Sequence, residues 1–278
     1  MTLTEQLFAL AEAGTAADLL ALLDADPGLL HVRRPLPDSP HATDRPTLLQ
    51  VVAVAGHLDL VKALAARGAE LYEQAQWRYP AVMHAAWAGQ QAVVDWFLGD
   101  GAAQPLMLHD PTYGLGVDIN HAARMGWTDI VRRHLARDRH AANRRGQLGD
   151  VPLHWAAHNN HTDIVRALLD AGADIEADEV GFYGGRPLHW AAEHAPECVA
   201  LLLAAGADPN ARNAMPGDMA GITPLIMCAR QPDDCGECAR LLLAAGADAS
   251  LVGDDGLTAL AIAEQQGRTR VAEALSAR

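Results

Sequence analysis

The chain has 278 residues and half of them are hydrophobic, so it is long enough to bury a substantial core. Only 5% of the residues are aromatic, and alanine and leucine dominate the apolar set, which favours close-packed helices over a β-sandwich. The formal net charge of −14 argues against a general attraction to nucleic acid or to an anionic membrane.

The N-terminal segment is not expected to direct the chain to a membrane. The start, Met1-Thr2-Leu3-Thr4-Glu5, lacks the basic residues and the long apolar run of a signal peptide. Elsewhere the apolar runs are short and interrupted by Gly, Asp and Arg, so no segment is predicted to span a bilayer. Four cysteines in a chain of this length do not make a disulfide framework. We therefore expect a cytoplasmic protein.

Both ends of the chain are predicted to be capping segments that close a stack of helical repeats. Residues 4–30 fit two short amphipathic helices, Glu5–Ala13 and Ala16–Ala25, ended by Asp26-Pro27-Gly28. The last helix is expected over Val271–Leu275, where charged residues flank it. Because stacked repeats bury their faces only against neighbours, terminal repeats need a polar outer face, as these segments have.

One block of sequence recurs between these ends: a turn, a short Ala-rich helix, a second helix, and Leu-Leu followed by Gly-Ala-Asp. The clearest copy runs from Val151 to Asp174, and the next runs from Arg186 to Asp208. The spacings between equivalent helix starts are 33, 37, 34, 35, 37 and 35 residues, so each repeat is predicted to be one helix pair. These starts are Thr47, Pro80, Val117, Val151, Arg186, Thr223 and Thr258.

Each part of the block has a physical role. Proline presets the first helical turn and lacks an amide that would have no partner there. Paired alanines let the first helix approach its neighbour closely. Glycine ends the second helix in the left-handed conformation that other residues adopt only at a cost. These glycines are Gly68, Gly101, Gly172, Gly206 and Gly246.

The pieces Pro-Leu-His-x-Ala-Ala and Leu-Leu-x-x-Gly-Ala-Asp closely resemble the ankyrin-repeat family, over nearly the whole chain, and such proteins are found in many bacteria. The resemblance implies an all-α ankyrin-repeat solenoid of about eight helix-pair repeats with finger loops, in a single domain over residues 1–278. Residues 1–45 would be the N-terminal capping repeat and loop, 46–253 the internal repeats, and 254–278 the C-terminal capping repeat.

A column of exposed residues is predicted on one side of the first helices. The residue before each Ala pair, and those three and four positions further on, lie one turn apart, and in similar stacks this side lines the concave groove. Rigid aromatics beside arginine are typical of binding hot spots, although tryptophans in this column could instead pack on the next helix. The column holds His84, Trp87, His121, Arg124, Trp155, His158, Trp190, Glu193 and His194, and the overhanging loops hold Tyr79, Tyr113, Phe182 and Tyr183.

The same histidines raise the alternative of a metal or active site. Neighbouring helices lie about 10 Å apart, which is too far for four histidines to share one ion with bonds near 2 Å. The sequence has no His-Glu-x-x-His spacing. We therefore predict no catalytic residue, no cofactor and no metal, and we keep a small ligand or metal in the Trp/His-lined groove as the alternative function. His154 and His189, within Pro-Leu-His, are expected to be scaffold.

Two further groups have competing interpretations. Cys235-Gly236-Glu237-Cys238 could indicate zinc or redox chemistry, but Cys238 falls in a buried aliphatic column, and we interpret it as core, like Cys198 and Cys228. A basic cluster could hold an acidic partner, a phosphate or nucleic acid, or could be a solvated helix face. The cluster comprises Arg124, Arg132, Arg133, Arg137, Arg139, Arg144 and Arg145.

The sequence therefore predicts a protein–protein interaction scaffold or regulator rather than an enzyme. It is expected to bind a protein or peptide through its concave groove and finger loops. The partner, its pathway and the oligomeric state are not encoded in any motif that we recognise.

Overall fold

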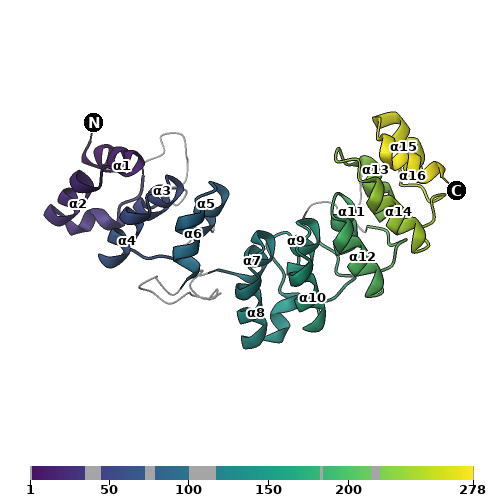
Figure 1. Ribbon diagram of the computed structural model, residues 1–278, viewed down its shortest axis with the longest axis horizontal. Helices are drawn as coiled ribbons and strands as arrows, with labels where there is room; N and C mark the ends of the chain where they lie inside the picture. Colours follow the sequence, from purple (N-terminus) through teal and green to yellow (C-terminus); the bar gives the residue numbers. More distant parts are fainter. Residues whose placement is uncertain are drawn as a thin grey trace. The chain divides into compact units, whose positions relative to one another are not determined.

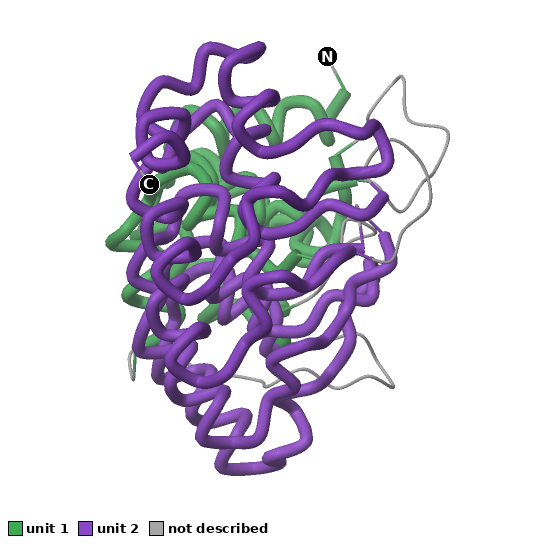
Figure 2. The backbone as a smooth tube through the Cα atoms, turned by 90° about the vertical axis from the view of Figure 1, so that its right-hand side faces the viewer, with its two compact units in different colours: residues 1–118 green, residues 119–278 purple. Residues whose placement is uncertain are grey.

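The computed structural model describes residues 2–34, 45–72, 79–99, 117–181, 184–213 and 220–277. The helices form two compact units, unit 1 over residues 1–118 and unit 2 over residues 119–278 (Figure 2). The single domain over the whole chain stays a prediction.

The described residues of unit 1 form three helix pairs. Within it α1 packs on α3 and α3 packs on α5, so the first helices of the pairs are stacked in chain order. The two helices predicted for the N-terminal segment are confirmed, because they begin and end within two residues of the expected bounds, and their role as a cap stays a prediction. The helices are α1 (Leu3–Ala13), α2 (Ala16–Ala25), η1 (Pro27–His31), α3 (Leu48–Val54), α4 (Leu58–Ala66), α5 (Ala81–Trp87) and α6 (Gln91–Leu98).

In unit 2 the part of the chain that the structure describes forms five helix pairs and one short 3-10 helix. The first helices stack in the order α7, α9, α11, α13, α15, and the second helices stack beside them in the order α8, α10, α12, α14, α16 (Figure 1). They are α7 (Ile119–Met125), α8 (Thr128–Arg137), η3 (Arg139–Asn143), α9 (Pro152–His158), α10 (Thr162–Asp170), α11 (Pro187–Ala192), α12 (Pro196–Ala204), α13 (Pro224–Arg230), α14 (Gly236–Ala244), α15 (Ala259–Gln266) and α16 (Thr269–Ser276).

The predicted all-α architecture of eight helix pairs is thus confirmed. The described residues contain sixteen α-helices and no strand beyond isolated bridges such as Arg33 with Thr47. None of these helices is both long enough and apolar enough to cross a membrane.

The helix starts follow from local chemistry. Thr223 accepts a hydrogen bond from the amide of Ile226, and the proline that follows it fills the first helical position. At the other end of a repeat, Gly172 has φ of 90°, the left-handed conformation predicted for it. Only α7 differs from expectation, since it begins at Ile119, two residues after Val117. The other predicted starts are N-caps: Thr47, Pro80, Val151, Arg186, Thr223 and Thr258.

His154 joins its own turn to the next repeat. The amide of Val151 donates to Nδ1 of His154 at 3.1 Å, so the ring proton is assigned to Nε2, which lies 3.1 Å from the carbonyl oxygen of Gly185. The scaffold role predicted for this histidine is confirmed.

His189 repeats this arrangement one repeat later. Its Nδ1 accepts from the amide of Arg186 at 3.1 Å, and its Nε2 lies 2.9 Å from the carbonyl oxygen of Ile222. The side chain is 0% exposed, and this burial lowers the pKa of His189 from 6.5 to about 4. The ring is therefore neutral in the folded chain at pH 7.

The core interpretation of the cysteines is confirmed, with one correction. Cys198, Cys228 and Cys238 are fully buried, and burial raises the pKa of Cys198 to about 12 and that of Cys228 further. Cys235 and Cys238 form a disulfide across the first turn of α14, which the sequence reasoning missed because it treated Cys238 as an aliphatic substitute.

Candidate binding face

The predicted column is partly assembled on one side of α7, α9 and α11. We call this surface the first-helix face of unit 2 and define it by Arg124, Trp155, His158, Glu193 and His194. Four of these residues are partly exposed, and His194 is exposed. The predicted column residues come from the third to the sixth helix pairs, and this face comes from the fourth to the sixth.

Trp155 is held in one orientation by two neighbours. Its indole Nε1 donates to Oδ2 of Asp150 at 2.6 Å, and the guanidinium carbon of Arg124 lies 4.6 Å from the ring centroid. Asp150 is buried and also accepts from the amide of Leu148 at 3.2 Å, so the carboxylate is itself fixed. Arg124 over an indole ring gains about 0.5–1 kcal/mol when the pair is exposed. The result is an oriented cation–aromatic pair at a partly exposed position.

Trp190 is not on the exposed face, and that part of the prediction is wrong. Its side chain is 4% exposed. The ring packs edge-on against Trp155, with centroids 5.0 Å apart, and against His154 at 5.2 Å and His158 at 5.8 Å. Trp190 therefore packs beneath the ring of Trp155 in the core. Because it is buried, it cannot line the Trp/His groove of the alternative ligand-binding function.

His158, Glu193 and His194 meet at the ends of α9 and α11. Nδ1 of His158 lies 3.7 Å from Oε2 of Glu193, and the two imidazole centroids are 4.6 Å apart. Burial lowers the pKa of His158, and the neighbouring His194 lowers it further. At pH 7 the ring of His158 is thus neutral, so its approach to Glu193 is not a charged ion pair.

Three other predicted residues form a separate cluster in unit 1. The rings of Tyr79 and Trp87 lie edge to face with centroids 4.5 Å apart, and His84 lies 5.6 Å from Trp87. Trp87 is 43% exposed, which makes it the most accessible of the three tryptophans in the column. Burial lowers the pKa of His84. The predicted residues are thus divided between the two units, with His121 half-buried on α7. Tyr113, Phe182 and Tyr183 lie outside the described residues.

The arginine cluster mostly serves the scaffold. Arg139 donates to the carbonyl oxygen of Asp170 at 2.5 Å, and Arg145 donates to that of Asp178 at 2.6 Å. Arg144 lies 3.5 Å from Asp138. These contacts favour the interpretation as a structural and solvated face over an anion-binding patch.

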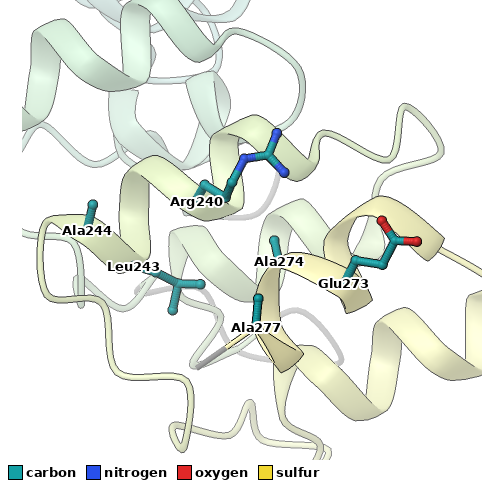
Figure 3. Close-up of a pocket in the computed structure, with 6 residues that line it drawn as sticks. All are labelled: Arg240, Leu243, Ala244, Glu273, Ala274 and Ala277. Carbon is teal, nitrogen blue, oxygen red and sulfur yellow. The ribbon is translucent and has the colours of Figure 1, made fainter.

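An open pocket between α14 and α16 lies apart from the first-helix face (Figure 3). Its cation, Arg240, is paired with Glu237 at 2.7 Å. Small apolar side chains supply most of the remaining wall, and few polar groups converge to fix a ligand. The lining residues are Arg240, Leu243, Ala244, Glu273, Ala274 and Ala277.

Sequence reasoning missed two carboxylates that position residues of the first-helix face. Asp150 orients Trp155, and Asp233 lies 3.5 Å from Nδ1 of His194. Asp150 could have been suspected because it immediately precedes a predicted helix start. Asp233 comes from the loop of the following repeat, and no motif marks it.

Comparison with known proteins identifies the family. A family model for ankyrin repeats, described as three copies, matches residues 119–213 and 188–278. These ranges cover more than half of the chain, so the chain belongs to the ankyrin-repeat family. Ankyrin repeats indicate a protein–protein interaction module.

Curated relatives match shorter stretches. The chain is 41% identical over 63 residues to palmitoyltransferase akr1 of Aspergillus oryzae, which is 23% of this chain and 8% of the relative. It is 36% identical over 110 residues to palmitoyltransferase Hip14 of Drosophila melanogaster, which is 38% of this chain and 16% of the relative. It is 39% identical over 56 residues to alpha-latrocrustotoxin-Lt1a of Latrodectus tredecimguttatus, 20% of this chain and 4% of the relative. The bacterial source and the cytoplasmic location stay predictions.

Proposed function

We propose that this chain is an interaction scaffold or regulator that binds a protein or peptide partner through the first-helix face of unit 2. The observation that supports the proposal is the oriented pair of Arg124 and Trp155, which Asp150 holds in place. Aromatic and arginine anchors carry much of the binding energy in protein interfaces. Anchors that are already oriented lose little side-chain entropy when a partner arrives.

The chemistry of the pair suggests what part of a partner would dock. The indole of Trp155 offers an apolar surface, and the guanidinium of Arg124 offers a fork that fits a carboxylate. We therefore propose that the docking segment has an aromatic or aliphatic side chain next to an acidic one. The finger loops and the concave groove remain part of the proposed surface.

We do not extend the palmitoyltransferase activity of the relatives to this chain. The matched stretches cover 8% and 16% of those two proteins. Covalent acyl transfer needs an activated nucleophile, and the cysteines here are poor candidates. Cys198 and Cys228 are buried with raised pKa values, and Cys235 is bonded to Cys238. The proposed function is binding without catalysis.

Replacing Arg124 or Trp155 should weaken partner binding. For a protein captured from native lysate by the wild type, we expect the affinity to fall by about tenfold or more with Arg124→Glu, and likewise with Trp155→Ala. The measurement is affinity capture followed by titration of the captured protein.

Arg132→Glu is the matched control, because Arg132 is 61% exposed on α8 and carries the same charge change. It should bind like the wild type, and circular dichroism should show that all variants are folded. Equal capture by all four proteins, or loss with Arg132→Glu alone, contradicts the proposal.

A further inference from the structure

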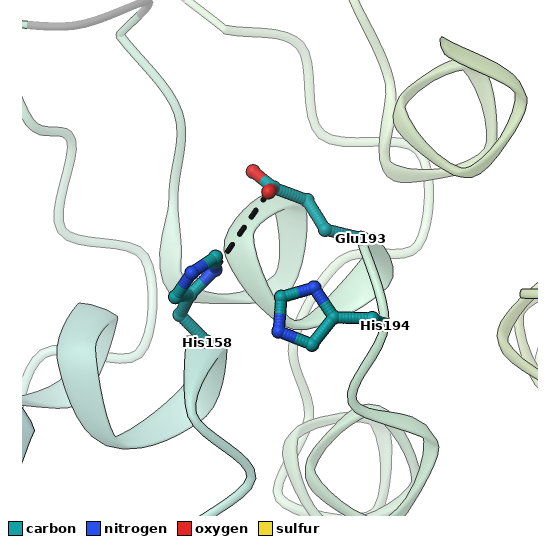
Figure 4. A group of neighbouring side chains, drawn as sticks. All are labelled: His158, Glu193 and His194. Atoms are coloured by element: carbon teal, nitrogen blue, oxygen red, sulfur yellow. Dashed lines mark ion pairs between the residues drawn. The ribbon is translucent and has the colours of Figure 1, made fainter. Parts of the chain in front are cut away.

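Two histidines and a glutamate from neighbouring repeats meet where α9 and α11 end. His158 is the last residue of α9, and Glu193 and His194 directly follow α11. One ligand atom from each side chain lies within 4.8 Å of the others. Figure 4 shows the two imidazole rings and the carboxylate turned toward one another.

The separation of the closest pair fits two ligands of one ion. Nδ1 of His158 and Oε2 of Glu193 are 3.7 Å apart, which is too long for a hydrogen bond. A tetrahedral ion with bonds of about 2.1 Å holds its ligand atoms about 3.4 Å apart. All the ligand atoms lie within 4.8 Å of one another, so the widest separation would have to shorten by at most about 1.4 Å, which side-chain rotations can supply.

The nitrogen that faces Glu193 lacks a hydrogen bond. Nδ1 of His158 is buried and makes no hydrogen bond with any residue that the structure describes. A buried nitrogen that makes no hydrogen bond with the described residues gains from a cation placed between it and the carboxylate of Glu193.

A carboxylate on the far side of His194 completes the arrangement. Oδ2 of Asp233 lies 3.5 Å from Nδ1 of His194, which leaves Nε2 as the ring nitrogen for an ion. Histidines that bind metals usually direct their second nitrogen toward a carboxylate or carbonyl, which fixes the tautomer. The side chain of His194 is 37% exposed, so an ion and its water can enter from solvent.

We propose that His158, Glu193 and His194 bind a divalent transition-metal ion of the Zn²⁺ type, with Asp233 orienting His194. Imidazole and carboxylate ligands suit Zn²⁺, and three protein ligands leave one tetrahedral position for water. The ion would link the repeat of α9 to the repeat of α11 beside Trp155. The site is independent of the proposed partner, because it needs no second protein to form.

Zinc titration of the full chain tests the site. Protein stripped by a chelator, with its disulfide intact, should bind one Zn²⁺ at this site in isothermal titration calorimetry. His158→Gln, Glu193→Gln and His194→Gln should each weaken that binding by at least about tenfold, because even outer partners of a metal ligand contribute about ten- to a hundredfold. Zn²⁺ should also raise the unfolding temperature of the wild type but not of these variants.

His140→Gln is the matched control, since His140 is an exposed histidine on η3. It should bind Zn²⁺ like the wild type. Glu193→Gln changes the shape of the side chain little, so loss of binding there does not reflect misfolding. Absence of Zn²⁺ binding by the wild type, or unchanged binding by the three variants, overturns the proposal.

Cobalt distinguishes this site from the cysteines. Co²⁺ bound here should give visible d–d bands without a sulfur-to-metal charge-transfer band, and should quench Trp190, whose ring lies 5.8 Å from that of His158. A charge-transfer band without tryptophan quenching would mean that the disulfide had been reduced and that Cys235 and Cys238 bind the ion as thiolates, and it would overturn the proposal.

Discussion

Trp190→Ala should destabilise unit 2 by about 3–5 kcal/mol, the usual cost of truncating a buried tryptophan. The ring is 4% exposed and packs edge-on against Trp155, His154 and His158. Its removal leaves a cavity between α9 and α11, where the short helices have little freedom to collapse. Urea denaturation followed by far-ultraviolet circular dichroism measures the change in the free energy of unfolding.

Trp87→Ala is the chemically matched comparison. Trp87 is 43% exposed, so its truncation should cost less than about 1 kcal/mol in the transition of unit 1. A cost below about 1 kcal/mol for Trp190→Ala would show that the ring is not packed as the structure has it. Trp190 would then again be a candidate for contact with a partner.

Acidification should destabilise the stack through its buried histidines. The folded pKa of His189 is about 4 and its reference value is 6.5, so only the unfolded chain takes up a proton between these values. Stability is therefore complete above pH 6.5 and is lost as the pH falls toward 4. At pH 4 His189 should have lowered the free energy of unfolding by about 3 kcal/mol relative to pH 7. His154, whose pKa is also lowered by burial, should add to this loss.

His189→Asn isolates this contribution. Asparagine can still accept from the amide of Arg186 but does not titrate, so the variant should be less stable at pH 7 and lose less stability on acidification. The measurement is the free energy of unfolding in urea at a series of pH values from 7 to 4. Parallel curves for the wild type and the variant would contradict a neutral, buried His189.

The repeat architecture was predictable because its determinants are local. Prolines, threonine caps and glycines each act within one helical turn, and six of seven predicted starts are N-caps. The roles of His154 and His189 were predictable for the same reason, since each bonds its own turn and the carbonyl one repeat later.

The solvent exposure of the column tryptophans was not predictable from the sequence, because it depends on side chains of the neighbouring repeats. The hexapeptide Pro-Leu-His-Trp-Ala-Ala occurs identically at residues 152–157 and 187–192. Trp155 nevertheless stays partly exposed under Arg124, whereas Trp190 is enclosed by its aromatic neighbours. The same motif therefore places its tryptophan at a partly exposed position in one repeat and in the core in the next.

A metal site was only the alternative interpretation of the sequence, because helix spacing was used as the limit for four histidines. About 10 Å between helices does exclude one ion for four histidines. Two histidines and a glutamate at helix ends can still meet, because these long side chains reach across the gap, as His158, Glu193 and His194 do.

Site-specific photo-crosslinking reports directly which face of the chain touches a partner inside the cell. A photoreactive residue would replace Asn159, which is exposed beside Trp155 on the first-helix face, or Arg132 on α8. Binding through the first-helix face should give a discrete protein adduct from position 159 and none from position 132. Adducts from position 132 alone, or from neither position, would contradict binding through the first-helix face of unit 2.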